Sequence, residues 1–481
     1  MNHLKKIIFC CLLLLPALLS YAQKHKSAPI TLNNISFLPA DSTRKICIRK
    51  LEVTGTKKTK IYIVYREIQF KKGDSLVISS LQKELEQARR QVYNTTLFNE
   101  VSFDLTVLDS VNLNINVHVT ERWYLYPVPQ FQLVDRNFNE WWKTYNRSFD
   151  RVNYGIKFVH YNLSGRRDQL RIYLINGYTR NISFSYNNPY SNRSLSNGFV
   201  VNAGYSQNRE TPYKTDSSNK ILQYKKDDFT RNSFYAGVGF TIRKGLFKRH
   251  FFSASFTHMK VDDSIIYYNP KYFNGPVTSR NIIDFAYLFQ YANVNNVSYA
   301  LTGKTAFLSV QKRGLGFTGG INMLTLEAGF NRYFSLGKNW YSSIYLNGKL
   351  RLPFDQAYIN QRGLGYGENY LRGLEYYVID GVATALVKAT LKKKIVSFNI
   401  PFRLFPKVFT KIPFTFFAKT YGDAGYAYNK KTTYTYLNNR LLYSGGFGID
   451  ILTLYDINLR FEYSFNQLGK NGLFLHNQSG F

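Results

Sequence analysis

Beyond residue 22 the chain contains no apolar run long enough to cross a bilayer as a helix, yet many of its segments alternate apolar and polar residues. In an extended strand, Ile344 and Leu346 would lie on one face, while Asn347, Lys349 and Arg351 would lie on the other. Only helices and closed barrels satisfy all backbone hydrogen bonds inside a membrane. The alternation therefore predicts a mainly β fold, a transmembrane antiparallel β-barrel with an apolar exterior and a wet lumen.

The same pattern recurs close to the C-terminus. Four apolar residues share one face of the segment 458–465, namely Leu459, Phe461, Tyr463 and Phe465. A shift of one residue would move charge into hydrocarbon, so the register is strongly specified. Aromatic residues make up 17% of the chain, but the mean hydropathy is only −0.28. A polar lumen and exposed loops explain why a membrane barrel is hydrophilic on average.

The N-terminus has the pattern of an export signal. Lys5 and Lys6 precede the apolar stretch 7–19, and the residues up to Ala22 provide a cleavage site. We therefore expect a signal peptide over residues 1–22. Two of the three cysteines lie within it. The mature chain would keep only Cys47, which excludes an intrachain disulfide even in an oxidising compartment.

The chain is strongly basic. Its formal net charge of +33 falls to +31 when Lys5 and Lys6 leave with the signal. In a soluble protein this charge would favour nucleic acid as a partner, because Lys and Arg neutralise phosphates. In an exported barrel, a basic lumen or basic loops would attract anionic lipid headgroups or anionic segments of a partner. We therefore expect outer-membrane lipids as neighbours and no nucleic-acid partner.

Residues 45–122 follow a different pattern, after a polar tether over residues 23–44. A strand over 46–53, a helix around 61–68, a second helix, and strands over 101–107 and 111–119 are expected. The second helix has the apolar stripe Leu81, Leu85, Ala88 and Val92. Ser79, followed by Gln82, has the spacing of a capping box at its start. The order β-α-α-β-β predicts one small α/β domain in front of the barrel.

Residues 123–481 are expected to form the barrel itself. Trp123, Tyr124 and Tyr126 form an aromatic cluster typical of a membrane interface. These 359 residues would accommodate sixteen strands at about 22 residues per strand and connection, although fourteen or eighteen strands would also fit.

Three motifs occur within this region. Leu371-Arg372-Gly373-Leu374 is followed by Tyr421-Gly422-Asp423-Ala424-Gly425, and the chain ends in a strand-like segment that contains Leu473, Leu475 and Phe481. In this order, and behind a β-α-α-β-β domain, they resemble the BamA/TamA superfamily of outer-membrane assembly factors. Members of that superfamily carry periplasmic polypeptide-transport-associated (POTRA) domains before a barrel that is usually sixteen-stranded.

The resemblance implies how the first two motifs act. Asp423 shares a strand face with Lys419 and Tyr421, and a carboxylate in an enclosed lumen needs a cationic partner. By the resemblance, that partner is Arg372, on a long loop that folds into the lumen after the eleventh strand. Gly373 and Gly425 would let the loop and the barrel wall approach closely. We call this expected contact the lumen-loop lock.

The other expectations concern the last strand and the lumen charge. Leu473, Leu475 and Phe481 belong to the closing strand, whose glycines and polar residues predict weak pairing with the first barrel strand. By the resemblance, Phe481 serves the protein's own insertion. Lys388, Lys392 and Lys394 share one strand face and are expected as lumen cations, where relatives often carry a carboxylate. A second acidic contact to Arg372 is therefore not expected.

The sequence lacks the patterns of an enzyme. It contains no His-Glu-x-x-His, no Gly-x-Ser-x-Gly and no paired cysteines, and its seven histidines are scattered. We therefore expect no catalytic residues, no metal and no cofactor.

Two functions remain open. The first is an assembly or translocation factor of the outer membrane, whose periplasmic POTRA-like domain binds unfolded or exported client polypeptides by β-augmentation while the barrel inserts or passes them. Accessory lipoproteins are further partners that the resemblance suggests. The alternative is a passive anion-selective channel or structural porin, in which the lumen lysines would line the pore.

Overall fold

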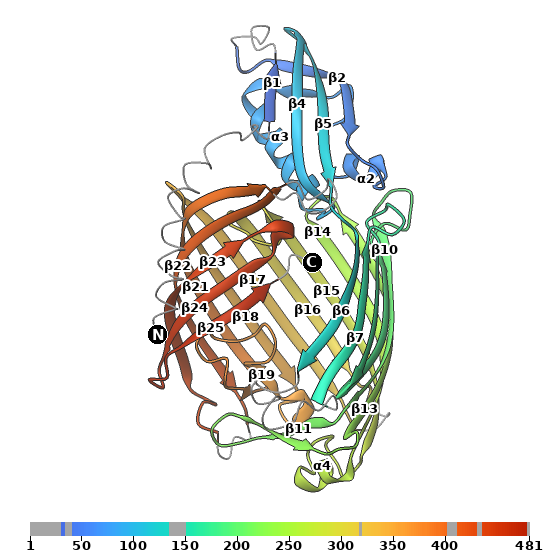
Figure 1. The fold of residues 1–481 in the computed structure, drawn as a ribbon, viewed down its shortest axis with the longest axis vertical. Coiled ribbons are helices and arrows are strands. Elements are labelled where there is room, and N and C mark those ends of the chain that lie inside the picture. The colour runs from blue at the N-terminus through green and yellow to red at the C-terminus, as the bar shows by residue number, and fades with distance from the viewer. Residues whose placement is uncertain are drawn as a thin grey trace.

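The computed structural model describes residues 30–33, 41–133, 151–316, 320–401, 411–430 and 435–478. They form a small α/β domain that stands on one end of a barrel (Figure 1). The expected signal peptide over residues 1–22 and the terminal Phe481 lie outside the described residues. None of the described helices is both long enough and apolar enough to cross a membrane.

The small domain consists of one sheet and two helices. Its elements are β1 (Ile30–Asn33), β2 (Lys45–Thr54), α2 (Ile61–Tyr65), β3 (Ser75–Val77), α3 (Ile78–Tyr93), β4 (Phe98–Asp109) and β5 (Asn112–Glu121). The strand order is β1-β4-β5-β2-β3. The predicted stripe of α3 lies against this sheet, because its four apolar residues are buried in one core with alternate residues of β4 and β5.

The tether and the segment between the helices differ from expectation. Residues 30–33, predicted as part of the polar tether, form β1, which pairs in parallel with β4. Ile30 and Leu32 pack against the domain core, which explains why so short a segment forms a strand. A further strand, β3, lies between the two helices in the chain and pairs with β2. The predicted order β-α-α-β-β therefore lacked one strand.

The helix starts also differ from expectation. The first helix is only the short α2, and it ends at Tyr65. The predicted capping box at Ser79 was wrong, because β3 leads directly into α3 and the extended backbone of Val77 takes the N-cap position.

The barrel is a sixteen-stranded antiparallel sheet, as predicted. Its strands, in the order in which neighbours pair, are β6 (Leu125–Leu133), β7 (Val152–Tyr161), β8 (Gln169–Gly177), β9 (Thr179–Asn188), β10 (Asn197–Asn208), β13 (Arg231–Lys244), β14 (Lys248–Val261), β15 (Ser279–Val294), β16 (Gly303–Arg313), β17 (Met323–Gly337), β18 (Trp340–Leu352), β21 (Ala383–Pro401), β22 (Lys411–Tyr428), β23 (Leu441–Leu452), β24 (Asn458–Asn466) and β25 (Gly472–Gln478).

Shorter elements lie in the connections. They are β11 (Glu210–Thr215), β12 (Ile221–Lys225), α4 (Asp263–Tyr268), η4 (Tyr358–Asn360), β19 (Arg362–Leu364), β20 (Ile379–Asp380) and η6 (Leu454–Asp456). Connections next to the small domain are short, such as residues 338–339 between β17 and β18. The longest connections lie at the opposite end and include the segments 209–230 and 353–382. This asymmetry is typical of membrane barrels with short periplasmic turns.

The predicted faces of the strands are confirmed. Ile344 and Leu346 on β18 are 42% and 44% exposed, whereas Asn347 and Arg351 are buried within the barrel. On β24, the aromatic residues 461, 463 and 465 are exposed while Glu462 is buried. An apolar outer face therefore surrounds a polar interior.

Candidate functional site in the barrel lumen

The segment 353–382, here called the lumen loop, packs against the inner wall of the barrel. It follows β18, the eleventh strand of the sheet. Leu371 and Leu374 of the loop are buried in one cluster with Leu386 on β21 and Leu442 on β23. The loop is thus held at its centre by apolar contacts, which place Arg372 next to the polar wall.

The structure brings Arg372 and Asp423 together. The side chain of Asp423 has no exposed surface, and one of its oxygens accepts hydrogen bonds from the backbone N–H of Arg372 at 3.0 Å and from Nε at 2.9 Å. The other oxygen pairs with Nη2 of Arg372. This bidentate contact matches the planar guanidinium to the carboxylate. The remaining donors of Arg372 bond to Thr390 and to the carbonyl of Ala389 on β21, so Asp423 is its single acidic hydrogen-bond partner among the described residues.

Two glycines allow this close approach. Gly373 has a φ of +90°, and a Cβ there would lie 2.6 Å from Cβ of Ser464 on β24. A Cβ on Gly425 would lie 2.9 Å from a methyl carbon of Leu371. Gly373 thus requires glycine, whereas a side chain at residue 425 would displace Leu371 of the loop.

The three lumen lysines are not equivalent. Nζ of Lys392 lies 3.1 Å from Asp450 on β23 and donates to the hydroxyl of Tyr299. Lys388 lies over the ring of Tyr370, with Nζ 4.1 Å from its centroid. The backbone N–H of Lys394 donates to Asn339 at the end of the barrel near the small domain. Asp450 in turn pairs with Lys419, which also pairs with Glu462, so Lys392 belongs to a charge-balanced network rather than to an open ring of cations.

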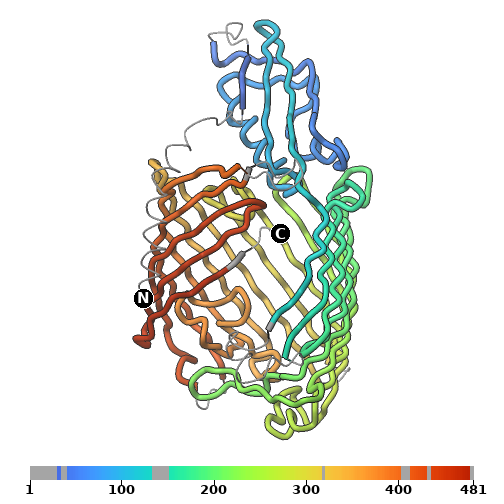
Figure 2. The backbone as a smooth tube through the Cα atoms, in the orientation of Figure 1, coloured from blue at the N-terminus to red at the C-terminus, as the bar shows by residue number. Residues whose placement is uncertain are grey.

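The two end strands of the sheet are β6 and β25, and no hydrogen-bonded ladder joins them within the described residues. Figure 2 shows their backbones at the two ends of the curved sheet. Leu473 and Leu475 on β25 are 61% and 65% exposed and face outward. Within the described residues, the seam between β6 and β25, expected to be weak, is therefore unpaired.

The contact between the small domain and the barrel was not predicted. Glu67, which follows α2, forms a bidentate ion pair with Arg243 at the end of β13, with N–O distances of 2.5 and 2.6 Å. Both side chains are buried, at 1% and 4% exposure. At the opposite side of the domain, Arg122 pairs with Asp456 of η6 at 2.7 Å. No local pattern signals either pair, because each joins residues far apart in the chain.

The Glu67 contact predicts a pH-dependent position of the small domain. Burial alone would raise the pKa of Glu67, but the hydrogen bonds and charge of Arg243 outweigh burial and lower this pKa below its ordinary value. The ion pair therefore stabilises the docked domain fully above the ordinary glutamate pKa of about 4.3. This stabilisation disappears as the pH falls through the lowered pKa of Glu67. Energy transfer between dyes on the two domains should stay constant down to about pH 5 and fall below about pH 4. Glu67→Gln should remove this acid transition, and an unchanged transition in that variant would contradict the assignment.

Comparisons with known proteins match this architecture. The family model described as POTRA, surface antigen variable number repeat, matches residues 46–122. BamA from Haemophilus ducreyi lacking POTRA domains 1-3 matches with a TM-score of 0.50 and 14% identity over 90% of this chain and 84% of that chain. CdiB from Escherichia coli matches with a TM-score of 0.51 and 11% identity over 90% and 75% of the two chains. No curated protein sequence matches the chain. The small domain is thus a POTRA domain, and the barrel has the fold of these two proteins.

Proposed function

We propose that this chain is a non-enzymatic assembly or translocation factor of the outer membrane, with its POTRA domain in the periplasm. The observation that carries the proposal is a POTRA domain held at one end of a barrel whose first and last strands share no ladder in the described region. A client that leaves the POTRA domain would meet the seam on the same molecule. BamA and CdiB share this fold, which supports the same class of role.

Part of β2 offers an open edge of the POTRA sheet to a client. β5 is central in the sheet, so the alternating segment 111–119 is not available for pairing. β1 covers the outer edge of β4, and β3 pairs only with Lys45–Cys47 of β2. Residues 50–54 of β2 pair with β5 on one side, and no other described strand pairs with them. We assign this edge to β-augmentation by an extended client segment, which would read the client's backbone rather than its sequence.

The lumen-loop lock would hold the closing strands in place while the seam between β6 and β25 accepts a client strand. Arg372 joins the loop to β22 through Asp423, and Gly373 lies against β24. The closing strands are therefore supported from inside by the loop, while their outer edge stays free to pair with a client strand. Outer-membrane lipids would contact the apolar exterior next to the seam.

The anion-channel alternative has weaker support. Lys392 and Lys419 both pair with Asp450, and the lumen loop occupies part of the interior. An anion-selective pore needs unpaired cations along an open path.

Site-specific photo-crosslinking tests the seam directly. We expect a photoreactive phenylalanine analogue at Val128 of β6 or Leu475 of β25 to form adducts with client polypeptides in growing cells. Phe330 on β17 is the matched control, because it is 40% exposed on the outer face, close to the 42% of Val128, but lies far from the seam in strand order. Adducts in equal yield at Phe330, or none at either seam position, would argue against passage at the seam.

A further inference from the structure

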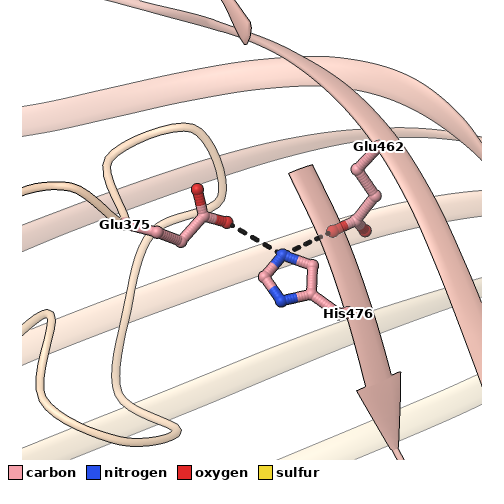
Figure 3. A group of neighbouring side chains, drawn as sticks. All are labelled: Glu375, Glu462 and His476. Carbon is pink, nitrogen blue, oxygen red and sulfur yellow. Dashed lines mark hydrogen bonds and ion pairs between the residues drawn. The ribbon is translucent and has the colours of Figure 1, made fainter. Parts of the chain in front are cut away.

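We propose that Glu375, Glu462 and His476 form a binding site for a divalent transition-metal ion, with Zn²⁺ as the expected occupant. The three side chains come from the lumen loop, β24 and β25, and they converge in the barrel interior (Figure 3). No sequence pattern indicates this site, because the residues are dispersed and no local metal-ligand spacing links them. The proposal does not depend on the function proposed above.

The strand register directs His476 inward. Leu473 and Leu475 of β25 face outward, so the alternating residues Phe474 and His476 face the lumen. His476 is paired across the ladder with Arg460, and the neighbouring pair on the same face joins Phe474 to Glu462. The lumen loop then places Glu375 on the other side of the imidazole.

The distances between ligand atoms suit a metal ion. Nε2 of His476 lies 3.2 Å from Oε1 of Glu375 and 3.4 Å from Oε2 of Glu462. Zinc bonds of about 2.0–2.2 Å at tetrahedral angles separate neighbouring ligand atoms by about 3.4 Å. All three ligand atoms lie within 4.8 Å of one another, so an ion at their centre requires only small side-chain movements.

One oxygen at the site lacks a hydrogen bond. Glu462 is only 1% exposed, and its Oε2 has no hydrogen-bond partner, whereas its Oε1 lies 2.6 Å from Nζ of Lys419. A buried carboxylate oxygen without a partner is costly. Nε2 of His476 bonds to Oε1 of Glu375 and leaves Oε2 of Glu462 without a partner, whereas a metal ion between the three atoms would bind all of them.

The surrounding contacts hold the ligands in position. The backbone N–H of Gly373 donates to Oε2 of Glu375 at 3.0 Å, which leaves Oε1 directed at the histidine. The ring of Tyr370 stacks on the imidazole, with 5.5 Å between centroids and 22° between planes. Supporting contacts of this kind orient metal ligands and raise affinity.

The ligand set selects the type of ion. One imidazole nitrogen and two carboxylate oxygens suit Zn²⁺ or Co²⁺, and they leave a fourth position for water. Two carboxylates also balance the charge of a divalent ion. The nearby Lys419 pairs with Asp450 and with Oε1 of Glu462, which leaves Oε2 of Glu462 for the ion.

A bound ion would connect three parts of the barrel. It would join the lumen loop to β24 and to β25, the strand at the seam. The closing strand would then be held from inside at His476, close to the lumen-loop lock. Metal binding is therefore expected to stabilise the end of the sheet at β25, which pairs with β24 alone among the described strands.

The test uses the full chain, purified in detergent and freed of metal with a chelator. Calorimetric titration with Zn²⁺ should show one equivalent per chain, and Co²⁺ should give the visible absorption of a tetrahedral site. His476→Asn and Glu375→Gln should each weaken binding at least ~10-fold. His258→Asn is the matched control, because His258 lies on β14 and bonds to Asn281, away from the site. Zn²⁺ should also raise the unfolding temperature of the wild type and of His258→Asn, but not of the other two variants.

If His476→Asn on β25 prevents folding, Glu375→Gln still tests the proposal, because residue 375 belongs to the loop and not to a barrel strand. Equal affinity in the wild type and in Glu375→Gln would overturn the site, as would the lack of saturable binding to the folded wild type.

Discussion

Arg372→Ala is expected to destabilise the barrel by about 3–5 kcal/mol and to abolish assembly activity while export of the chain continues. The substitution removes both guanidinium contacts to Asp423, whose side chain has no exposed surface. Of the hydrogen bonds described for this carboxylate, only that from the backbone N–H of residue 372 would remain. The midpoint of heat-induced unfolding on a detergent gel measures the stability, and the amount of client in the outer membrane measures the activity.

Two controls separate the lock from general effects of arginine removal. Arg440→Ala removes an exposed arginine that lies over the ring of Tyr436, so it should change stability by less than about 1 kcal/mol. Arg372→Lys keeps the charge but not the bidentate geometry, and an intermediate effect is expected. Replacing both Arg372 and Asp423 by alanine should cost less than the sum of the single changes, because no unpaired charge is left. Wild-type heat resistance and activity in Arg372→Ala would refute the lock.

Regular features of the fold could be predicted from the sequence. A strand places alternate residues on opposite faces, so Ile344 and Asn347 already distinguish lipid from lumen. In the same way, the apolar stripe of α3 predicts which face of the helix is buried. The pairing of Arg372 with Asp423, by contrast, came from a resemblance in motifs, since 51 residues separate them and no periodicity connects them.

Contacts between side chains that lie far apart in the chain could not be predicted from the sequence. Lys392 was expected as a pore cation because its own strand face points inward, but Asp450 on another strand neutralises it. Glu67 and Arg243 are separated by 176 positions, and His476 meets Glu375 only after the loop enters the lumen. The strand β1 is four residues long and acquires its conformation from β4. In each case the long-range contact, rather than the local sequence, decides the outcome.

Arg243→Ala is expected to weaken the contact between the POTRA domain and the barrel by about 3–5 kcal/mol, because it leaves Glu67 buried without its cation. The ratio of docked to undocked domain should fall by roughly two to four orders of magnitude. Lys225→Ala is the matched control. Lys225 pairs with Glu210 at 3.2 Å, but its side chain is 58% exposed, and exposed pairs contribute little.

We expect the second ion pair to act as a pivot when the Glu67 contact is broken. Arg122 and Asp456 are 2% and 6% exposed and connect the end of the POTRA domain to η6, between β23 and β24. When the Glu67 ion pair is broken and the Arg122 pair stays intact, the domain should pivot about Arg122 rather than separate from the barrel. Energy transfer between dyes near residue 67 and the end of β13 should therefore decrease and broaden, while transfer between dyes near residue 122 and η6 should stay unchanged. Replacing Glu67 and Arg243 together by methionine should restore the first signal, because apolar residues of similar length leave no buried charge. An equal decrease at both positions would mean that the domain detaches as a whole and that the Arg122 pair does not act as the pivot.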